Sequence, residues 1–181
     1  MVTTKEPKSF LAPLPVVLVT TRGSKDNIVA LSWVGIHENK PPMLNINISK
    51  GKYSAGIIKE TRQFGVCIPR KENIREVDIC GSTHGDRVDK FSLTGFSKLE
   101  AERINVPLLK ECPVRMECTL EKIIPFSSHD MFIGKVVLTH IEDAYEKGGK
   151  PDYSKLDMLC YVGGQYWSLG EKKENLFYTK T

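Results

Sequence analysis

The sequence has no apolar run approaching the roughly 20 residues that a membrane helix needs. We also expect no secretory leader, because Pro13 and Pro15 interrupt the apolar stretch 10–19 and no small-x-small cleavage motif follows it. We therefore expect residues 1–12 to be an N-terminal tail that leads into a strand. The expected protein is cytoplasmic and has no membrane partner.

Clusters of positive charge are missing as well. Lys and Arg number 26 against 22 Asp and Glu, a net charge of +4, and the basic residues are scattered along the chain. This distribution argues against nucleic acid as a partner. It permits an anionic small molecule.

Paired cysteines with the C-x-x-C spacing are absent, and the five cysteines are odd in number. A disulfide framework and a zinc ribbon are therefore not expected, and we predict no metal site. We expect most of these thiols to be small buried hydrophobic groups.

Several well-known catalytic and nucleotide-binding motifs are missing too. There is no G-x-G-x-x-G after an expected strand, no H-E-x-x-H and no G-x-S-x-G. Residues 51–56 have the glycine spacing of a Walker loop, but Ile57 and Ile58 stand where that loop needs Lys and Ser or Thr. No triad or phosphate loop of these kinds is predicted.

What the chain does have is a series of short β-branched and apolar runs separated by turn residues. We expect strands over 16–21, 28–33, 43–48, 64–68, 114–125, 131–141 and 159–167, and helices over 53–60, 72–80 and from 88. Three strands within the first fifty residues indicate a meander and not βαβ units. Residues 1–181 are predicted to form one mainly β domain, a barrel with short helices in its connections.

Residues 114–125 alternate clearly between apolar and polar side chains. Val114, Met116 and Cys118 fall on one face, and Arg115 and Glu117 fall on the other. This period of two is typical of a half-buried strand, so Arg115 and Glu117 are expected to face solvent.

Two polar segments are candidates for binding an anion. Residues 49–54 (SKGKYS) link a strand to a helix, where free N–H groups and the positive end of the helix dipole meet Lys52. An N-capping serine beside solvated lysines is the competing reading. The loop 81–86, followed by Lys90, could face the same anion or be an ordinary turn.

Two ring side chains also have two readings each. Trp33, at a strand end, could be a stacking platform or part of the core. His129, between Ser128 and Asp130, could be catalytic or a surface residue.

Taken in order, these pieces resemble the flavin reductase-like FMN-binding split-barrel family. The matching segments are 13–21, 27–33, Pro41-Pro42, Lys52-Tyr53-Ser54, 64–69, Cys80-Gly81, Asp89-Lys90-Phe91 and 128–136. The resemblance covers nearly the whole chain. It implies a six-stranded antiparallel split barrel of Greek-key character with short helices in the connections, and a homodimer.

The resemblance also implies FMN as cofactor and a set of binding residues. They are Asn27, Ala30, Leu31, Ser32, Trp33, Asn47 and Ser49 around the ring and ribityl chain, Lys52, Tyr53 and Ser54 at the phosphate, and Ser82, Lys90 and His129 closing the site. His129 is the expected catalytic residue, since a neutral imidazole could donate a hydrogen bond or pass a proton. Lys52 stands where many relatives have Arg, so a point charge replaces a bidentate grip.

The implied function is that of an FMN-binding oxidoreductase of the flavin reductase or flavoredoxin type. Electrons would pass from NADH or NADPH through FMN to free flavin, ferric iron or a redox partner protein. The alternative is an FMN-bound electron carrier without a nicotinamide site of its own.

Overall fold

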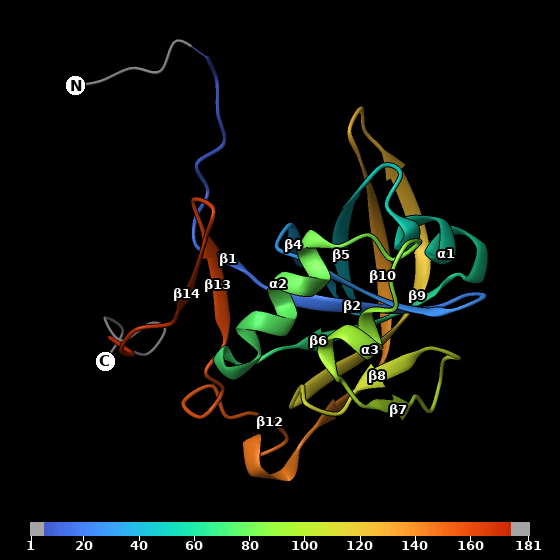
Figure 1. Ribbon diagram of the computed structural model, residues 1–181. Helices are drawn as coiled ribbons and strands as arrows, with labels where there is room; N and C mark the ends of the chain where they lie inside the picture. Colours follow the sequence, from blue (N-terminus) through green and yellow to red (C-terminus); the bar gives the residue numbers. More distant parts are fainter. Residues whose placement is uncertain (1–5, 175–181) are drawn as a thin grey trace.

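The structure is a computed structural model that describes residues 6–174 (Figure 1). Its main feature is a seven-stranded antiparallel sheet in the order β3-β2-β6-β9-β10-β5-β4. The strands are β2 (Val17–Arg22), β3 (Asp26–Leu31), β4 (Val34–Asn39), β5 (Pro42–Ser49), β6 (Gln63–Ile68), β9 (Val114–Pro125) and β10 (His129–Ile141).

The sheet closes on itself because of one short connection. β3 and β4 are the two edge strands, yet only Ser32 and Trp33 join them. Two residues span a few ångströms each, so the edges must lie next to one another. The Asn47 N–H of β5 donates to the Trp33 carbonyl at 2.9 Å, which extends the β4–β5 pairing into this connection. The sheet is therefore a barrel with an opening at the seam.

The remaining elements surround this barrel. The helices are α1 (Tyr53–Thr61), α2 (Ile74–Ser82) and α3 (Lys90–Thr94), with 3-10 turns η1 (Lys71–Asn73) and η2 (Asp143–Tyr145). The small sheets are β1 (Leu14–Pro15) with β13 (Leu159–Val162) and β14 (Gln165–Ser168), β7 (Lys98–Glu100) with β8 (Pro107–Leu109), and β11 (Glu146–Lys147) with β12 (Lys150–Pro151). Figure 1 shows the β13–β14 hairpin standing beside the N-terminal segment.

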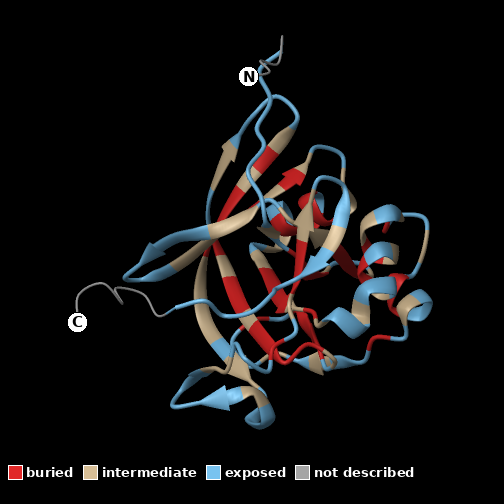
Figure 2. Cartoon of the chain, turned by 90° about the vertical axis from the view of Figure 1, so that its left-hand side faces the viewer, coloured by how far each residue is buried: buried red, intermediate tan, exposed pale blue. Residues whose placement is uncertain are grey.

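Two apolar clusters hold the fold together. One fills the barrel and includes Val19, Phe64 and Phe132; the other lies outside it, where Leu18 and Cys67 pack against α2 and α3. β2 therefore supplies alternate residues to both clusters, which explains its unbroken run of buried positions. Figure 2 shows buried positions along the central strands and exposed positions in the peripheral loops.

The mainly β split-barrel class is confirmed, with three corrections to the strand prediction. The predicted strand 159–167 is a hairpin, because Gly163 and Gly164 turn the chain between β13 and β14, and it lies in a separate sheet with β1. The main sheet has seven strands, not six, and four of them instead of three precede Lys50. The unpredicted strand is β4. It lies at an edge with residues 36–39 exposed, so it lacks the alternation that marks a half-buried strand.

The predicted loop at 81–86 is also corrected, because Gly81 and Ser82 form the last turn of α2. Residues 83–86 form bends and turns, as small polar residues predict, but Gly81 and Ser82 continue the helix that packs against β3.

The expectation that Arg115 and Glu117 face solvent is wrong, because both are buried. The Glu117 carboxylate accepts N–H groups of Glu102, Arg103 and Ile104, and the Arg115 guanidinium donates to the Cys112 carbonyl at 2.9 Å. Segments from elsewhere in the chain cover this face of β9. The alternation of apolar and polar residues along β9 cannot reveal this burial. Arg115 and Glu117 are polar because the groups that cover them are polar backbone N–H and carbonyl groups.

Within residues 6–174, no helix is long and apolar enough to cross a membrane. The segment 143–157 is mostly exposed, as its charge and glycine content predict.

Candidate functional site

A cavity of about 210 Å³ opens at the barrel seam. Its lining consists of residues 29–33 from the end of β3, residues 47–49 from the end of β5, and Lys52, Gly81 and His129. Eight of the predicted site residues meet here: Ala30, Leu31, Ser32, Trp33, Asn47, Ser49, Lys52 and His129. The seam therefore brings together segments that are up to a hundred residues apart in the chain.

Trp33 and His129 form a ring pair at one side of this cavity. Their ring centroids lie 4.7 Å apart with an interplanar angle of 31°. Trp33 is 52% exposed, so it is not a core residue. His129 Nδ1 lies 2.9 Å from Ser128 Oγ, and its Nε2 has no hydrogen-bond partner among residues 6–174. One imidazole nitrogen is thus available to a ligand.

The start of α1 lies at the same cavity, and Lys52 lines it. Lys52 is the N-cap residue and its side chain makes no capping bond. In the part of the chain that the structure describes, the N–H groups of Tyr53 and Ser54 have no partner. Two unpaired donors, the helix dipole and the Lys52 ammonium therefore meet at one place.

Asn27 and Ser54 are buried beneath this site and do not line it. The Asn27 Nδ2 donates to Ser54 Oγ at 2.8 Å, which joins β3 to α1. Gly85 lies against this pair, because a Cβ there would stand 2.2 Å from Asn27 Oδ1. This packing replaces the N-capping role considered for serine and ties three segments together.

Tyr53 and Ser82 also point elsewhere. The Tyr53 hydroxyl lies 3.3 Å from Ser24 Oγ, and Ser82 Oγ donates to the Asp78 carbonyl of its own helix at 2.7 Å. The structure does not bring either side chain to the cavity.

Lys90 is buried and donates to the Cys80 carbonyl in the last turn of α2 at 2.6 Å. It therefore satisfies a carbonyl at the C-terminal end of that helix. Burial lowers the pKa of Lys90, and the positive charge of Lys52 acts in the same direction.

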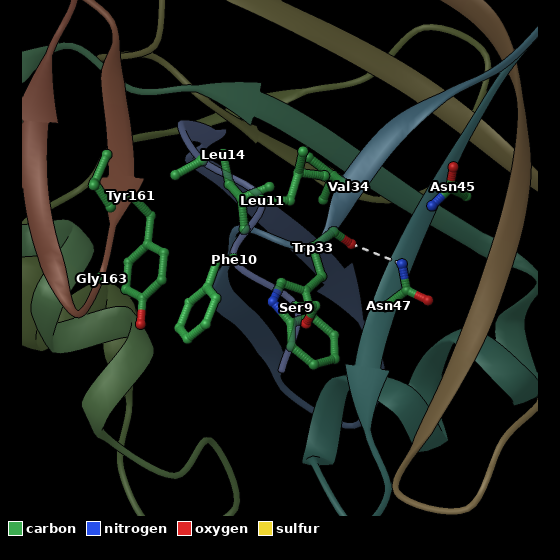
Figure 3. A pocket seen from close by; sticks show the side chains of 12 residues that line it. Ser9, Phe10, Leu11, Leu14, Trp33, Val34, Asn45, Asn47, Tyr161 and Gly163 are labelled. Carbon is green, nitrogen blue, oxygen red and sulfur yellow. Dashed lines mark hydrogen bonds between the residues drawn. The ribbon is translucent and has the colours of Figure 1, made fainter. Parts of the chain in front are cut away.

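Three lining residues were not among the predicted ones: Val29, Ile48 and Gly81. Their backbone or hydrophobic side chains line the wall, and sequence analysis gives no chemical signal for such a role. A second cavity, shown in Figure 3, shares the lining residues Trp33 and Asn47 with the first.

All five cysteines are free and buried. Burial raises the pKa of Cys80 to about 12, so this thiol stays neutral and unreactive at neutral pH. Among residues 6–174, no group of three His, Cys, Asp or Glu side chains is placed to hold a metal ion.

Comparison with known proteins places this geometry in a family. Residues 10–170 match the family model described as "Flavin reductase like domain", which confirms the resemblance seen in the sequence. A flavoredoxin from Methanosarcina acetivorans is 30% identical, with a TM-score of 0.93 over 99% of this chain and 97% of that one. The flavoredoxin of Desulfovibrio vulgaris (Miyazaki F) is 27% identical, with a TM-score of 0.91 over 100% of both chains. An uncharacterized protein of Pyrococcus abyssi is 30% identical over 88% of this chain and 90% of its own length.

Proposed function

The chain belongs to the flavin reductase-like domain family, and we propose that it is an FMN-binding oxidoreductase of the flavin reductase or flavoredoxin type. One domain, residues 1–181 with the tail 1–12, would carry this function. The observation that supports it most is the seam cavity, where the anion-binding start of α1 lies beside the Trp33–His129 ring pair.

The residues present fit the parts of FMN. The doubly negative phosphate would be bound by Lys52 and the unpaired N–H groups of Tyr53 and Ser54, since such charge-assisted bonds are strong. Asn47 and Ser49 would face the ribityl chain and the polar ring edge. Trp33 and His129 would border the ring system.

FMN, when bound, supplies the group that accepts and releases a hydride. The protein then needs to bind, orient and shield the cofactor rather than provide a catalytic triad. His129 is the proposed catalytic residue because its Nε2 is open to the cavity, where it could donate a hydrogen bond or move a proton.

We propose that electrons come from NADH or NADPH and leave to free flavin, ferric iron or a redox partner protein. One observation favours the carrier alternative. Within residues 6–174, Lys52 is the only Lys or Arg side chain that lines the seam cavity or the adjoining one. A dinucleotide with several phosphates would find little positive charge left beside bound FMN.

An absorption spectrum of the purified protein, followed by anaerobic NADH and then NADPH, tests this proposal. Flavin absorption bands at about 370 nm and about 450 nm that bleach with a nicotinamide would support the reductase and identify its electron donor. Bleaching with dithionite alone would support the carrier. A colourless protein that ignores added FMN would contradict flavin binding altogether.

We also propose a homodimer. A third cavity, of about 390 Å³, is lined by apolar residues of the edge strand β4 and of the segment 151–158, and Ile36 beside it is 90% exposed. An apolar patch on an unpaired edge strand suits a second copy of the same chain. Sedimentation should show a dimer that Ile36→Glu dissociates, whereas a wild-type monomer would contradict the proposal.

A further inference from the structure

Two contacts fix the imidazole ring of His129 at the seam cavity. Its face packs on the indole of Trp33, with the ring centroids 4.7 Å apart. Its edge meets the preceding side chain, because Nδ1 lies 2.9 Å from Ser128 Oγ. The other ring nitrogen, Nε2, has no hydrogen-bond partner among residues 6–174. The ring can therefore exchange a hydrogen bond with a ligand in this cavity only through Nε2.

Ser128 is itself held in place by backbone bonds around the β9–β10 turn. Its carbonyl accepts the Lys50 N–H at 2.9 Å, and the Phe126 N–H donates to the His129 carbonyl at 2.9 Å. His129 also pairs with Ser49 at the first position of the β10–β5 ladder. These bonds fix the backbone of both residues, so the hydroxyl and Nδ1 stay within reach of each other although the Ser128 side chain is exposed.

The direction of this hydrogen bond decides the tautomer of the ring. A neutral imidazole carries one N–H, and the bond made by one nitrogen determines which nitrogen carries the proton. A serine hydroxyl can donate or accept. If Ser128 donates, Nδ1 keeps its lone pair and the ring proton lies on Nε2. If Nδ1–H donated instead, the hydroxyl proton would find no acceptor among the described residues, because Nδ1 is the only partner of Ser128 Oγ within 6–174.

The surroundings of the ring favour the same direction. The Lys52 ammonium lines the cavity, and the start of α1 brings the free N–H groups of Tyr53 and Ser54 to it. A negatively charged ligand that these groups attract would accept a hydrogen bond from Nε2–H. It would be repelled by the lone pair of an unprotonated Nε2. The Nε2–H tautomer is therefore the one that suits an anionic ligand.

We propose that Ser128 is a positioning residue, whose hydroxyl donates to Nδ1 and holds neutral His129 in the Nε2–H form. His129 then offers a hydrogen-bond donor, and not an acceptor, to the seam cavity. The tautomer follows from the contacts of Ser128 alone. Its effect on flavin rests on the proposed function: a bound flavin gains negative charge when it is reduced, so a donor beside it should stabilise the reduced form.

The test is a nitrogen NMR spectrum of the imidazole rings in the full-length, isotope-labelled protein. It is recorded on the alkaline plateau of the titration, where the rings are neutral. Protonated and unprotonated ring nitrogens have well-separated chemical shifts, and the signals of His129 are identified by their loss in His129→Gln. We expect an unprotonated Nδ1 and a protonated Nε2. A protonated Nδ1 would overturn the proposal.

Two variants of Ser128 should move the proton by different amounts. Ser128→Asp places a carboxylate, which only accepts, beside Nδ1, so it should draw the ring proton to Nδ1 and invert the tautomer. Ser128→Ala removes the bond and should lower the ratio of Nε2–H to Nδ1–H about five- to tenfold, the worth of one hydrogen bond. The wild-type ratio in both variants would overturn the role of Ser128.

Matched controls separate the hydroxyl from other effects of substitution in this turn. Ser128→Thr keeps the hydroxyl and should keep the wild-type nitrogen spectrum. Ser127→Ala and Ser127→Asp make the same changes at the neighbouring exposed serine, which has no side-chain hydrogen bond within residues 6–174. Both should leave the His129 signals unchanged. Shifts in the Ser127 variants as large as in the Ser128 variants would overturn the proposal.

The midpoint potential of bound FMN in the same variants measures the effect on flavin. Ser128→Ala should weaken the preference of the protein for reduced over oxidised FMN several-fold and so lower the potential, where a tenfold loss corresponds to about 30 mV for two electrons. Ser128→Thr should keep the wild-type potential. A wild-type potential in Ser128→Ala, with the tautomer shifted, would overturn the effect on flavin.

The two readouts keep this inference distinguishable from the proposed function. A protein that does not bind FMN would overturn the proposed function, and the nitrogen spectra would still decide the tautomer. A flavin-containing protein with a protonated Nδ1 would overturn the role of Ser128 and leave the proposed function standing.

Discussion

The strand β10 carries a histidine at each end, and the two have different surroundings. His129, its first residue, pairs with Ser49 of β5, stacks on Trp33 and has one nitrogen open to the seam cavity. His140, near its other end, lies 2.6 Å through Nε2 from the carboxylate of Glu117. The same residue type is thus available for chemistry at one end and committed to structure at the other.

The difference comes from what each neighbouring strand supplies. Beside His129, β5 ends and leaves an opening. Beside His140, the first residues of β9 supply Glu117, which is fully buried and also accepts three backbone N–H groups of residues 102–104. A partner strand terminates beside each histidine, so what separates them is the buried carboxylate that meets His140 and the cavity that meets His129.

The largest expected effect is at the structural end. Glu117→Gln keeps the shape but removes the charge that holds residues 102–104 and His140, so the free energy of unfolding should fall by about 2–4 kcal/mol. Urea denaturation measures it. Glu121→Gln, at an exposed position of the same strand, is the matched control and should change little. If Glu117→Gln lowered the free energy of unfolding as little as the control does, the Glu117 carboxylate would not be important for stability.

The next effect is at the functional end. Lys52→Ala should weaken FMN binding by about 1.5–3 kcal/mol, because one charge-assisted bond to the phosphate is lost. Fluorescence titration of flavin measures this affinity. Lys122→Ala, an exposed lysine on β9, should leave it unchanged. Unchanged affinity in Lys52→Ala would remove this residue from the proposed phosphate site.

A direct comparison of the two histidines follows. His140→Ala should lower the free energy of unfolding by about 1–2 kcal/mol, since it removes a bond to a buried carboxylate, and should leave the flavin spectrum alone. His129→Ala should do the reverse, changing flavin reactivity or potential with little loss of stability. Thermal melts and anaerobic reduction of each variant check this. A large stability loss in His129→Ala with normal flavin behaviour would make it a structural residue too.

The smallest expected effect near neutral pH is the pH dependence of the stability that Glu117 provides beside His140. Burial by itself raises the pKa of the Glu117 carboxyl, but hydrogen bonds from the Glu102 N–H and the His140 ring outweigh it, so this pKa lies below its ordinary value. A carboxyl with a lowered folded-state pKa stabilises the fold above its unfolded pKa of about 4.3, and this contribution is lost as the pH falls through the folded pKa. The stability gap between wild type and Glu117→Gln should be wide at pH 7 and narrow at a pH of about 3. A gap that stays constant would show that the carboxylate is not ionised in the fold.

Local chemistry made several features predictable. The β-branched runs of β2 and β6 identified strands, since such residues pack well on pleated surfaces. The sequence SKGKYS located the start of α1 and its free N–H donors, because these donors belong to residues close together in the chain. The resemblance to a known family then joined these segments to Trp33 and His129.

Other features depended on distant partners. Lys90 and Ser54 have suitable chemistry for a phosphate site, but Lys90 bonds the Cys80 carbonyl and Ser54 bonds Asn27. Glu117 was expected at the surface because its alternation with Cys118 is regular, and only the segment folded over β9 buries it. A side chain's exposure is decided by what packs on it, which a local pattern does not contain.

The sequence by itself therefore determined the mainly β character of this protein, the positions of most strands and the polar loop at which α1 begins. These follow from hydrophobic periodicity and turn residues, which act over a few positions. Only the tertiary structure decided that the barrel closes through Ser32 and Trp33, that its seam is a cavity, and that a second cavity adjoins it. Closure and cavities arise where segments far apart in the chain pack imperfectly against each other, and that information lies in the packing and not in any one segment.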